Sequence, residues 1–203
     1  MRNLNVTNQK GRSMIEMLGV LAIIGVLSVG GIAGYSKAMM KYRINKTIEQ
    51  ITLIAGNVRS FFAPQGNYNG LTCDKTMLEG SGDWVGCPVV KKAKLVPDEM
   101  LEFNNDGSIA SITNIWGTPA ILAAYSPYHE FTITLGEIPL EACIELVSQD
   151  WSNANAERIC LDSGPRVSYC QTSPVDVEKA TEYCYNLISS TETYSKKVTF
   201  YFK

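Results

Sequence analysis

The strongest constraint on this chain is an uninterrupted apolar stretch near its N-terminus. Residues 17–36 contain no charged side chain, and Glu16 and Lys37 bracket them. A helix of about 20 apolar residues is long enough to cross the hydrocarbon core of a bilayer. The apolar region of a secretory signal peptide is shorter, about 7–15 residues, and a small-residue cleavage site follows it. We therefore predict a membrane-spanning helix rather than an ordinary signal peptide.

The cysteines all lie on the C-terminal side of this stretch. They are Cys73, Cys87, Cys143, Cys160, Cys170 and Cys184. An even number of cysteines on one side of a membrane segment indicates disulfides in an oxidising compartment. The alternative is a set of buried free thiols in the cytosol, and the basic residues between Lys37 and Lys46 favour it, because positive charge beside a span is typical of the cytoplasmic side. The membrane segment is an independent reason for export, and we favour disulfides.

Beyond Lys37 the apolar pattern becomes one-sided. Apolar residues recur at spacings of three and four from Ile44 to Phe62, and charged residues fall mostly between them. This spacing is typical of an amphipathic helix. Pro64 and Gly66 then end the pattern. We predict one helix from about Met14 to Ala63, whose second half needs a partner to cover its apolar face.

The remaining residues predict an α+β domain with an antiparallel sheet. Strands are expected over residues 119–125, 130–135 and 196–202, and helices over residues 139–149 and 175–189. Cys73 and Cys87 bracket a glycine-rich connection, which a bond between them would constrain. We expect the amphipathic half of the N-terminal helix to pack on this sheet.

Catalytic chemistry has little support in the sequence. The single histidine, His129, lies in an expected turn, and we interpret it as solvated or structural. We find no nucleophile motif, phosphate-binding loop or metal-type cysteine pair, and we predict no catalytic residue, cofactor or metal. Residues 104–108 offer oxygen ligands for calcium, but Asn-Asp-Gly is more typical of a tight turn. The net charge of −2 and the short basic run at residues 91–94 do not predict nucleic-acid binding.

The N-terminal sequence resembles the class III signal of type IV pilins. A basic leader with Arg2 and Lys10 ends at Gly11, Glu16 lies five residues beyond that glycine, and the apolar stretch follows at once. In this family a prepilin peptidase cuts after the glycine, so the apolar helix stays on the mature chain. The resemblance implies that cleavage separates Gly11 from Arg12. The family usually has an apolar residue where this chain has Arg12.

Glu16 also has a physical argument of its own. A carboxylate costs roughly 2.5–3.5 kcal/mol at the centre of a membrane helix, so a partner for it is expected. In type IV pilins that partner is the freed α-amine of a neighbouring subunit, and the pair sets the axial register of the fibre. The alternative is that Glu16 marks the membrane boundary among the headgroups. With Gly11 in place, we favour a role in assembly.

The rest of the chain resembles type IVb pilins in the order of four short motifs. These are Leu95–Met100, Asn114–Gly117, Phe131–Thr134 and Ile138–Cys143. In that subclass a cysteine on the helix after the second strand pairs with one on a helix near the C-terminus, which implies a bond between Cys143 and Cys184. Six cysteines allow fifteen pairings. We choose Cys143–Cys184, with Cys160–Cys170 nested inside it and Cys73–Cys87 separate.

The resemblance implies an organisation in four segments. Residues 1–11 are a cleaved leader, 12–36 a transmembrane and polymerisation helix, 37–63 its amphipathic half, and 64–203 an α+β head. The implied function is a structural, non-enzymatic subunit of a type IV pilus. The implied partners are other pilin subunits, the prepilin peptidase, an inner-membrane assembly platform and, before assembly, membrane lipid.

The implied location is the inner membrane with a periplasmic head before assembly, and an extracellular pilus afterwards. Two alternatives stay open at this point. One is a pseudopilin of a type II secretion system, which belongs to related machinery. The other, from a different class, is a membrane-tethered periplasmic enzyme or binding domain, and it would require a pocket with convergent polar groups.

Overall fold

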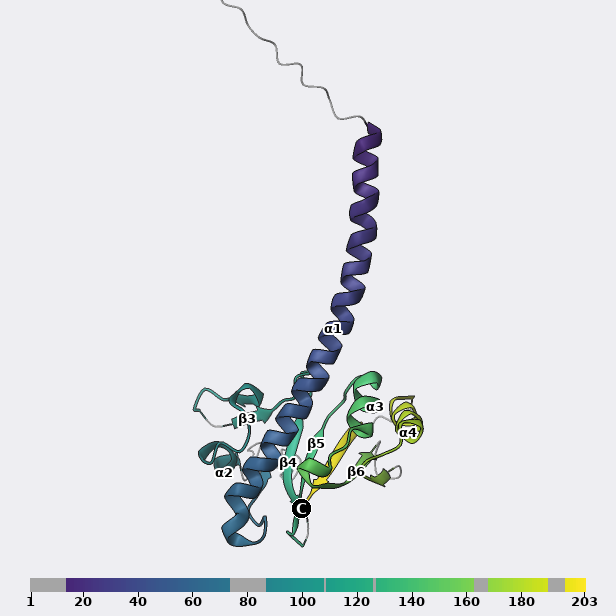
Figure 1. Ribbon diagram of the computed structural model, residues 1–203. Coiled ribbons are helices and arrows are strands. Elements are labelled where there is room, and N and C mark those ends of the chain that lie inside the picture. Colours follow the sequence, from purple (N-terminus) through teal and green to yellow (C-terminus); the bar gives the residue numbers. More distant parts are fainter. Residues whose placement is uncertain (1–13, 74–86, 108, 126, 163–167, 190–195) are drawn as a thin grey trace, which may run out of the picture. The chain divides into compact units, whose positions relative to one another are not determined.

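A long helix, α1 (Met14–Phe62), begins the part of the chain that the computed structural model describes (Figure 1). The described residues are 14–73, 87–107, 109–125, 127–162, 168–189 and 196–203. The chain divides into two compact units, residues 1–41 and 42–203. The first contains the apolar half of α1, and the second contains the rest of α1 and the folded head.

The second half of α1 forms one wall of the head. Its predicted apolar face is buried, and Ile44, Ile51, Ile54, Ala55, Val58 and Phe62 are each at most 3% exposed. The helix ends one residue before the predicted end. A short 3-10 turn over Ala63–Gln65 follows it and contains Pro64, and Gly66 then takes a left-handed conformation with a φ of 66°. Glycine adopts this conformation without a Cβ penalty. The helix therefore ends beside Pro64 and Gly66, as the sequence predicts.

The head is built on an antiparallel sheet of six strands, as the sequence predicts for its class. The strand order is β1-β4-β5-β8-β6-β7. The strands are β1 (Thr72–Cys73), β4 (Ala120–Tyr125), β5 (Glu130–Leu135), β6 (Ala156–Asp162), β7 (Ser168–Thr172) and β8 (Lys197–Phe202). The last strand in sequence, β8, lies in the middle and pairs with both β5 and β6. The head cannot complete its sheet until these distant segments meet.

Helices and a second, smaller sheet complete the head. The helices are α2 (Cys87–Lys92), α3 (Leu140–Ser148) and α4 (Val177–Ser189), and the smaller sheet pairs β2 (Leu101–Phe103) with β3 (Ile109–Ile112). Short 3-10 turns lie at Asp98–Met100 and Ser152–Ala154. The sequence predicts β4, β5, β8, α3 and α4 to within two residues at each end. It misses α2, the two-stranded sheet, and the β6–β7 hairpin.

A line of aromatic rings connects α1 to the centre of the sheet. The ring centroids of Phe62 and Tyr68 are 5.9 Å apart, those of Tyr68 and Phe131 are 4.8 Å apart, and those of Phe131 and Phe202 are 5.1 Å apart. Arg59 of α1 adds a polar link, because its Nε donates to the backbone oxygen of Lys203 at 2.6 Å. Phe131 and Phe202 are fully buried, so the core lies between α1 and this face of β5 and β8.

Two disulfides hold the C-terminal part of the head, and they are the pairs preferred from the sequence. Cys143 of α3 and Cys184 of α4 are bonded, and both are fully buried. Cys160 and Cys170 are bonded between directly paired positions of β6 and β7. The third preferred pair, Cys73–Cys87, involves side chains that lie outside the described part of the structure. The observed bonds join α3 to α4 and β6 to β7.

The two disulfides close loops of different length, which predicts different contributions to stability. The Cys143–Cys184 bond spans 41 residues and the Cys160–Cys170 bond spans 10. Because a longer loop restricts the unfolded chain more, we expect Cys143→Ala with Cys184→Ala to lower the free energy of unfolding by about 3–4 kcal/mol. Cys160→Ala with Cys170→Ala should cost about 1 kcal/mol less. Urea unfolding of both double variants, followed by tryptophan fluorescence, measures the difference, and a larger cost for the shorter loop would contradict it.

Candidate assembly site

The first half of α1 presents apolar side chains to its surroundings around its whole circumference. Leu18 is 65% exposed, Val26 is 75% exposed and Val29 is 72% exposed. A window of this helix has a mean hydropathy of 2.2, and none of it is buried within the structure. By length and composition the helix can cross a membrane. An apolar surface of this size is not stable in water and requires lipid or other helices around it.

Two serines in this stretch are satisfied within the helix. The Ser28 hydroxyl donates to the Ile24 carbonyl at 2.7 Å, and the Ser36 hydroxyl donates to the Ile32 carbonyl at 3.0 Å. A serine bonded to the carbonyl four residues earlier leaves no hydroxyl proton to be solvated. This arrangement suits an apolar environment, where an unpaired hydroxyl is costly.

The glycines of the apolar half pack against none of the side chains that the structure describes. A Cβ added to Gly19, Gly25, Gly30, Gly31 or Gly34 would meet no atom within 4 Å. Each glycine nevertheless lowers helix stability by roughly 1 kcal/mol relative to alanine. Small residues allow two helices to approach closely in an apolar medium. The described residues therefore give these glycines no packing role, and their small size would suit contacts with other helices.

Glu16 lies in the first turn of α1. A carboxylate there is favoured by the positive end of the helix dipole. Its position at the end of the apolar surface agrees with both sequence interpretations, assembly and membrane boundary. The predicted processing residues, Gly11 and Arg12, lie outside the described residues. The structure thus places Glu16 at the boundary of the apolar helix.

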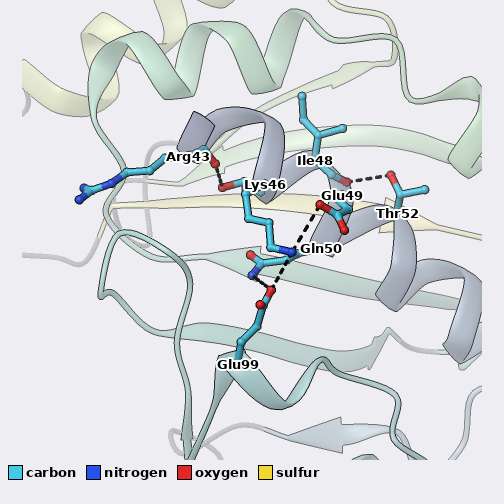
Figure 2. Close-up of polar contacts among 8 residues, drawn as sticks. Arg43, Lys46, Ile48, Glu49, Gln50, Thr52 and Glu99 are labelled. Carbon is cyan, nitrogen blue, oxygen red and sulfur yellow. Dashed lines mark hydrogen bonds and ion pairs between the residues drawn. The ribbon is translucent and has the colours of Figure 1, made fainter. Parts of the chain in front are cut away.

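The second unit contains a polar cluster that the sequence did not predict. Glu99, in the 3-10 turn over Asp98–Met100, accepts a hydrogen bond from the Gln50 Nε2 at 2.8 Å (Figure 2). The Lys46 Nζ lies 3.1 Å from the same Glu99 oxygen and 3.4 Å from the Glu49 carboxylate. The sequence contains an indication of this cluster. Thr47 and Gln50 are polar, yet they occupy positions on the buried face of α1 where the helical spacing predicts apolar residues.

The cluster shifts the ionisation of its members. The hydrogen bond from Gln50, and then that from Lys46, holds the pKa of Glu99 below its ordinary value of 4.5. Hydrogen bonding to Glu99 in turn raises the pKa of Lys46. Both shifts favour the charged forms, so the ion pair joins α1 to the turn at Asp98–Met100 at neutral pH. The side chain of Glu99 is 49% exposed, which limits the strength of this link.

His129, the loop at residues 104–108 and the basic run at residues 91–94 lie at separate places in the head. His129 is exposed in the turn between β4 and β5. The considered calcium loop forms a turn in which the Gly107 N–H donates to the Asn104 oxygen at 2.9 Å, and Ser108 lies outside the described residues. Within the ranges that the structure describes, no group of three or more histidine, cysteine or acidic residues is arranged to hold a metal ion. Lys91 of the basic run binds the Gly107 carbonyl.

Comparison with known proteins agrees with this architecture. The crystal structure of a type IVb pilin from Salmonella typhi matches with a TM-score of 0.52 and 15% sequence identity, over 77% of this chain and 97% of that chain. At this identity the match establishes the fold. A comparison with curated proteins gives no significant match.

A long apolar N-terminal helix, an antiparallel sheet beside its second half and a disulfide-bonded C-terminal part define a type IVb pilin fold. The family is shown by the sequence itself, since residues 41–200 match the family model described as PilS N terminal. The chain belongs to this family of pilins.

The polar cluster predicts an acid-sensitive contribution to stability. The folded-state pKa of Glu99 is depressed, so its contribution is present above about pH 4.5 and is lost as the pH falls through the folded-state pKa. Glu99→Gln should therefore flatten the loss of stability on acidification, by up to about 1 kcal/mol between pH 7 and pH 3, as for an exposed ion pair. Glu182→Gln, on the exposed face of α4, is the matched control. Identical acid profiles for Glu99→Gln and the unmodified chain in urea titrations would contradict the assignment.

Proposed function

We propose that this chain is a structural, non-enzymatic subunit of a type IV pilus and that it polymerises through α1 after prepilin peptidase cleavage between Gly11 and Arg12. The observation that carries the proposal is the fully apolar, unburied first half of α1 on a chain of a pilin family. One helix cannot cover this surface, and a bundle of identical helices covers it without any new fold. The glycines support the same proposal, because no contact with the described residues explains them.

The proposed life of the chain has two stages. Before assembly, residues 12–36 cross the inner membrane, and residues 37–63 together with the head at 64–203 lie in the periplasm. The disulfides of the head support this side of the membrane, because such bonds persist in oxidising compartments. During assembly, the helix leaves the lipid and enters the core of an extracellular fibre. The prepilin peptidase and an inner-membrane assembly platform are the expected partners of the first and second stage.

Glu16 has the central role in this proposal. In a core of packed apolar helices, the α-amine freed at Arg12 would be costly without a counter-charge. A glutamate in the first turn of a neighbouring copy would supply that charge. The pair would also align each helix with the next, since any other axial offset leaves two charges unpaired. Glu16 would thus set the register of the fibre as well as contribute to its stability.

Cleavage after Gly11 predicts a defined N-terminus in assembled material. Mass spectrometry of proteolysed fibres should find an N-terminal peptide that begins at Arg12 and continues into the apolar helix. Gly11→Val, a substitution at the predicted cleavage position, should leave the leader attached. A fibre peptide that begins at Met1, or one that begins beyond Ser36, would contradict cleavage at this bond.

The pairing of Glu16 predicts a selective loss of assembly. Glu16→Ala should leave the head folded and the chain inserted in the membrane, because neither needs this carboxylate. An unpaired buried amine costs about 3–5 kcal/mol, so fibre yield at matched subunit levels should fall at least about tenfold. Glu16→Asp should give an intermediate yield, since the charge remains but the reach is shorter by one methylene.

Glu178→Ala is the control for this experiment, because Glu178 also lies in the first turn of a helix, α4. This control should assemble normally. Normal fibres from Glu16→Ala would mean that Glu16 is a boundary residue and that helix packing through the glycines sets the register.

A further inference from the structure

The two disulfides described in the head differ in their exposure to solvent. Cys143 and Cys184, which join α3 to α4, are both fully buried. Cys160 is 2% exposed, whereas its partner Cys170 is an exposed residue. Thiol–disulfide exchange requires a thiolate to reach one of the two bonded sulfur atoms. By this criterion a reagent in solvent has access to one end of the Cys160–Cys170 bond and to neither end of the Cys143–Cys184 bond.

The exposed end of this bond lies at the edge of the main sheet. β7 is the last strand in the order of that sheet, and Cys170 is its middle residue. Cys160 lies on β6, and Thr199 of β8 is its directly paired neighbour on the inner side. The Thr199 hydroxyl in turn lies 3.1 Å from the Thr134 hydroxyl of β5, and both threonines are buried. These four side chains form a row that leads from an exposed edge to a buried interior.

Helix α4 lies on the opposite face of β7. The Tyr169 and Tyr183 rings stack with their centroids 4.8 Å apart, and the Gln171 Nε2 donates to the Tyr183 hydroxyl at 3.4 Å. Tyr169 and Gln171 flank Cys170 in β7, and successive side chains of a strand point to opposite faces of a sheet. The Cys160–Cys170 bond therefore lies on the face away from α4. This explains why α4 partly covers the flanking residues and leaves Cys170 exposed.

The position of the bond also determines which sulfur a thiolate attacks. A thiolate approaches one sulfur of a disulfide from the side opposite to the sulfur that leaves. An attack on the Cys170 Sγ comes from beyond β7, and among the described strands none follows β7 in the sheet. An attack on the Cys160 Sγ comes from the side of β8, where Thr199 lies. Access therefore selects Cys170 as the sulfur that is attacked and Cys160 as the sulfur that leaves.

We propose that Cys170 is a site of modification by small-molecule thiols. The thiolate of the reagent attacks the Cys170 Sγ, a new S–S bond joins the reagent to Cys170, and the Cys160 sulfur leaves as a thiolate. A second reagent thiolate then attacks the reagent sulfur of this mixed disulfide and releases the Cys170 thiolate. Two electrons pass to the protein disulfide, and two reagent thiols are oxidised to one disulfide. The inference goes beyond the proposed function and does not depend on polymerisation.

Reduced glutathione is the probe for the first test. The full chain in detergent micelles is incubated with increasing glutathione at about pH 8, at which part of the thiol is ionised, and is then quenched with iodoacetamide. Peptide mass spectrometry should find glutathione on Cys170 at least about tenfold more often than on Cys160, because access limits exchange. Cys160 should carry the alkyl group, and the Cys143–Cys184 bond should stay intact as the internal control.

Three results of this test overturn the proposal. One is a similar amount of glutathione on Cys160 and on Cys170. Another is opening of the Cys143–Cys184 bond at the same glutathione concentration as the Cys160–Cys170 bond. The third is the absence of any glutathione adduct on Cys170.

A matched pair of variants provides the second test. Cys160→Ser leaves Cys170 as a thiol, and Cys170→Ser leaves Cys160 as a thiol. In the folded full chain, iodoacetamide should modify Cys170 at least about tenfold faster than Cys160, and unfolding in urea should make the two rates similar. Equal rates in the folded variants overturn the proposal. If either variant does not fold, the glutathione test on the unmodified chain decides.

Discussion

One helix in this protein has to satisfy two different environments, and the rest of the structure depends on that constraint. The first half of α1 is apolar on every side, and the second half is apolar on one side only. The second half is covered by β5, β8 and the aromatic line from Phe62 to Phe202. Among the residues that the structure describes, none covers the first half. It is stable only in lipid or among other apolar helices. The chain therefore combines a folded domain with a helix that requires lipid or other helices around it.

The head, within residues 42–203, is a compact unit with a core of its own. Buried aromatic rings and a central β8 strand give it a core, and Arg59 joins the helix to the end of β8. The two disulfides described here fix α3 to α4 and β6 to β7, in the part of the chain where pairing depends on distant segments. In the proposed function, in which the subunit moves from lipid into a fibre, such a head would keep its fold while the surroundings of its helix change.

Two features of the structure have no explanation among the described residues. The glycines of the apolar half lower helix stability without improving any described contact. The Gln50 oxygen is buried without a donor among the described residues. Buried polar atoms of this kind are rare in native structures. Close helix packing in the proposed fibre would account for the glycines.

The sequence by itself determined the elements whose signals are local. The apolar stretch, the amphipathic face from Ile44 to Phe62 and the end of the helix at Pro64 and Gly66 follow from spacing and from backbone chemistry. Strands β4, β5 and β8 and helices α3 and α4 follow from their apolar patterns and flanking turn residues. The class of fold and the position of Glu16 at the edge of the apolar helix were predictable for the same reason.

Only the tertiary structure decided the features that depend on distant partners. The β6–β7 hairpin has a weak alternating pattern, and its place in the sheet comes from pairing with β8, more than thirty residues further along the chain. The Lys46–Gln50–Glu99 cluster joins residues about fifty positions apart. A polar residue on an apolar face signals that some partner exists, but its identity depends on which loop the fold brings to it. Hydrogen bonding and strand pairing of this kind act through space, and the linear order of residues does not record them.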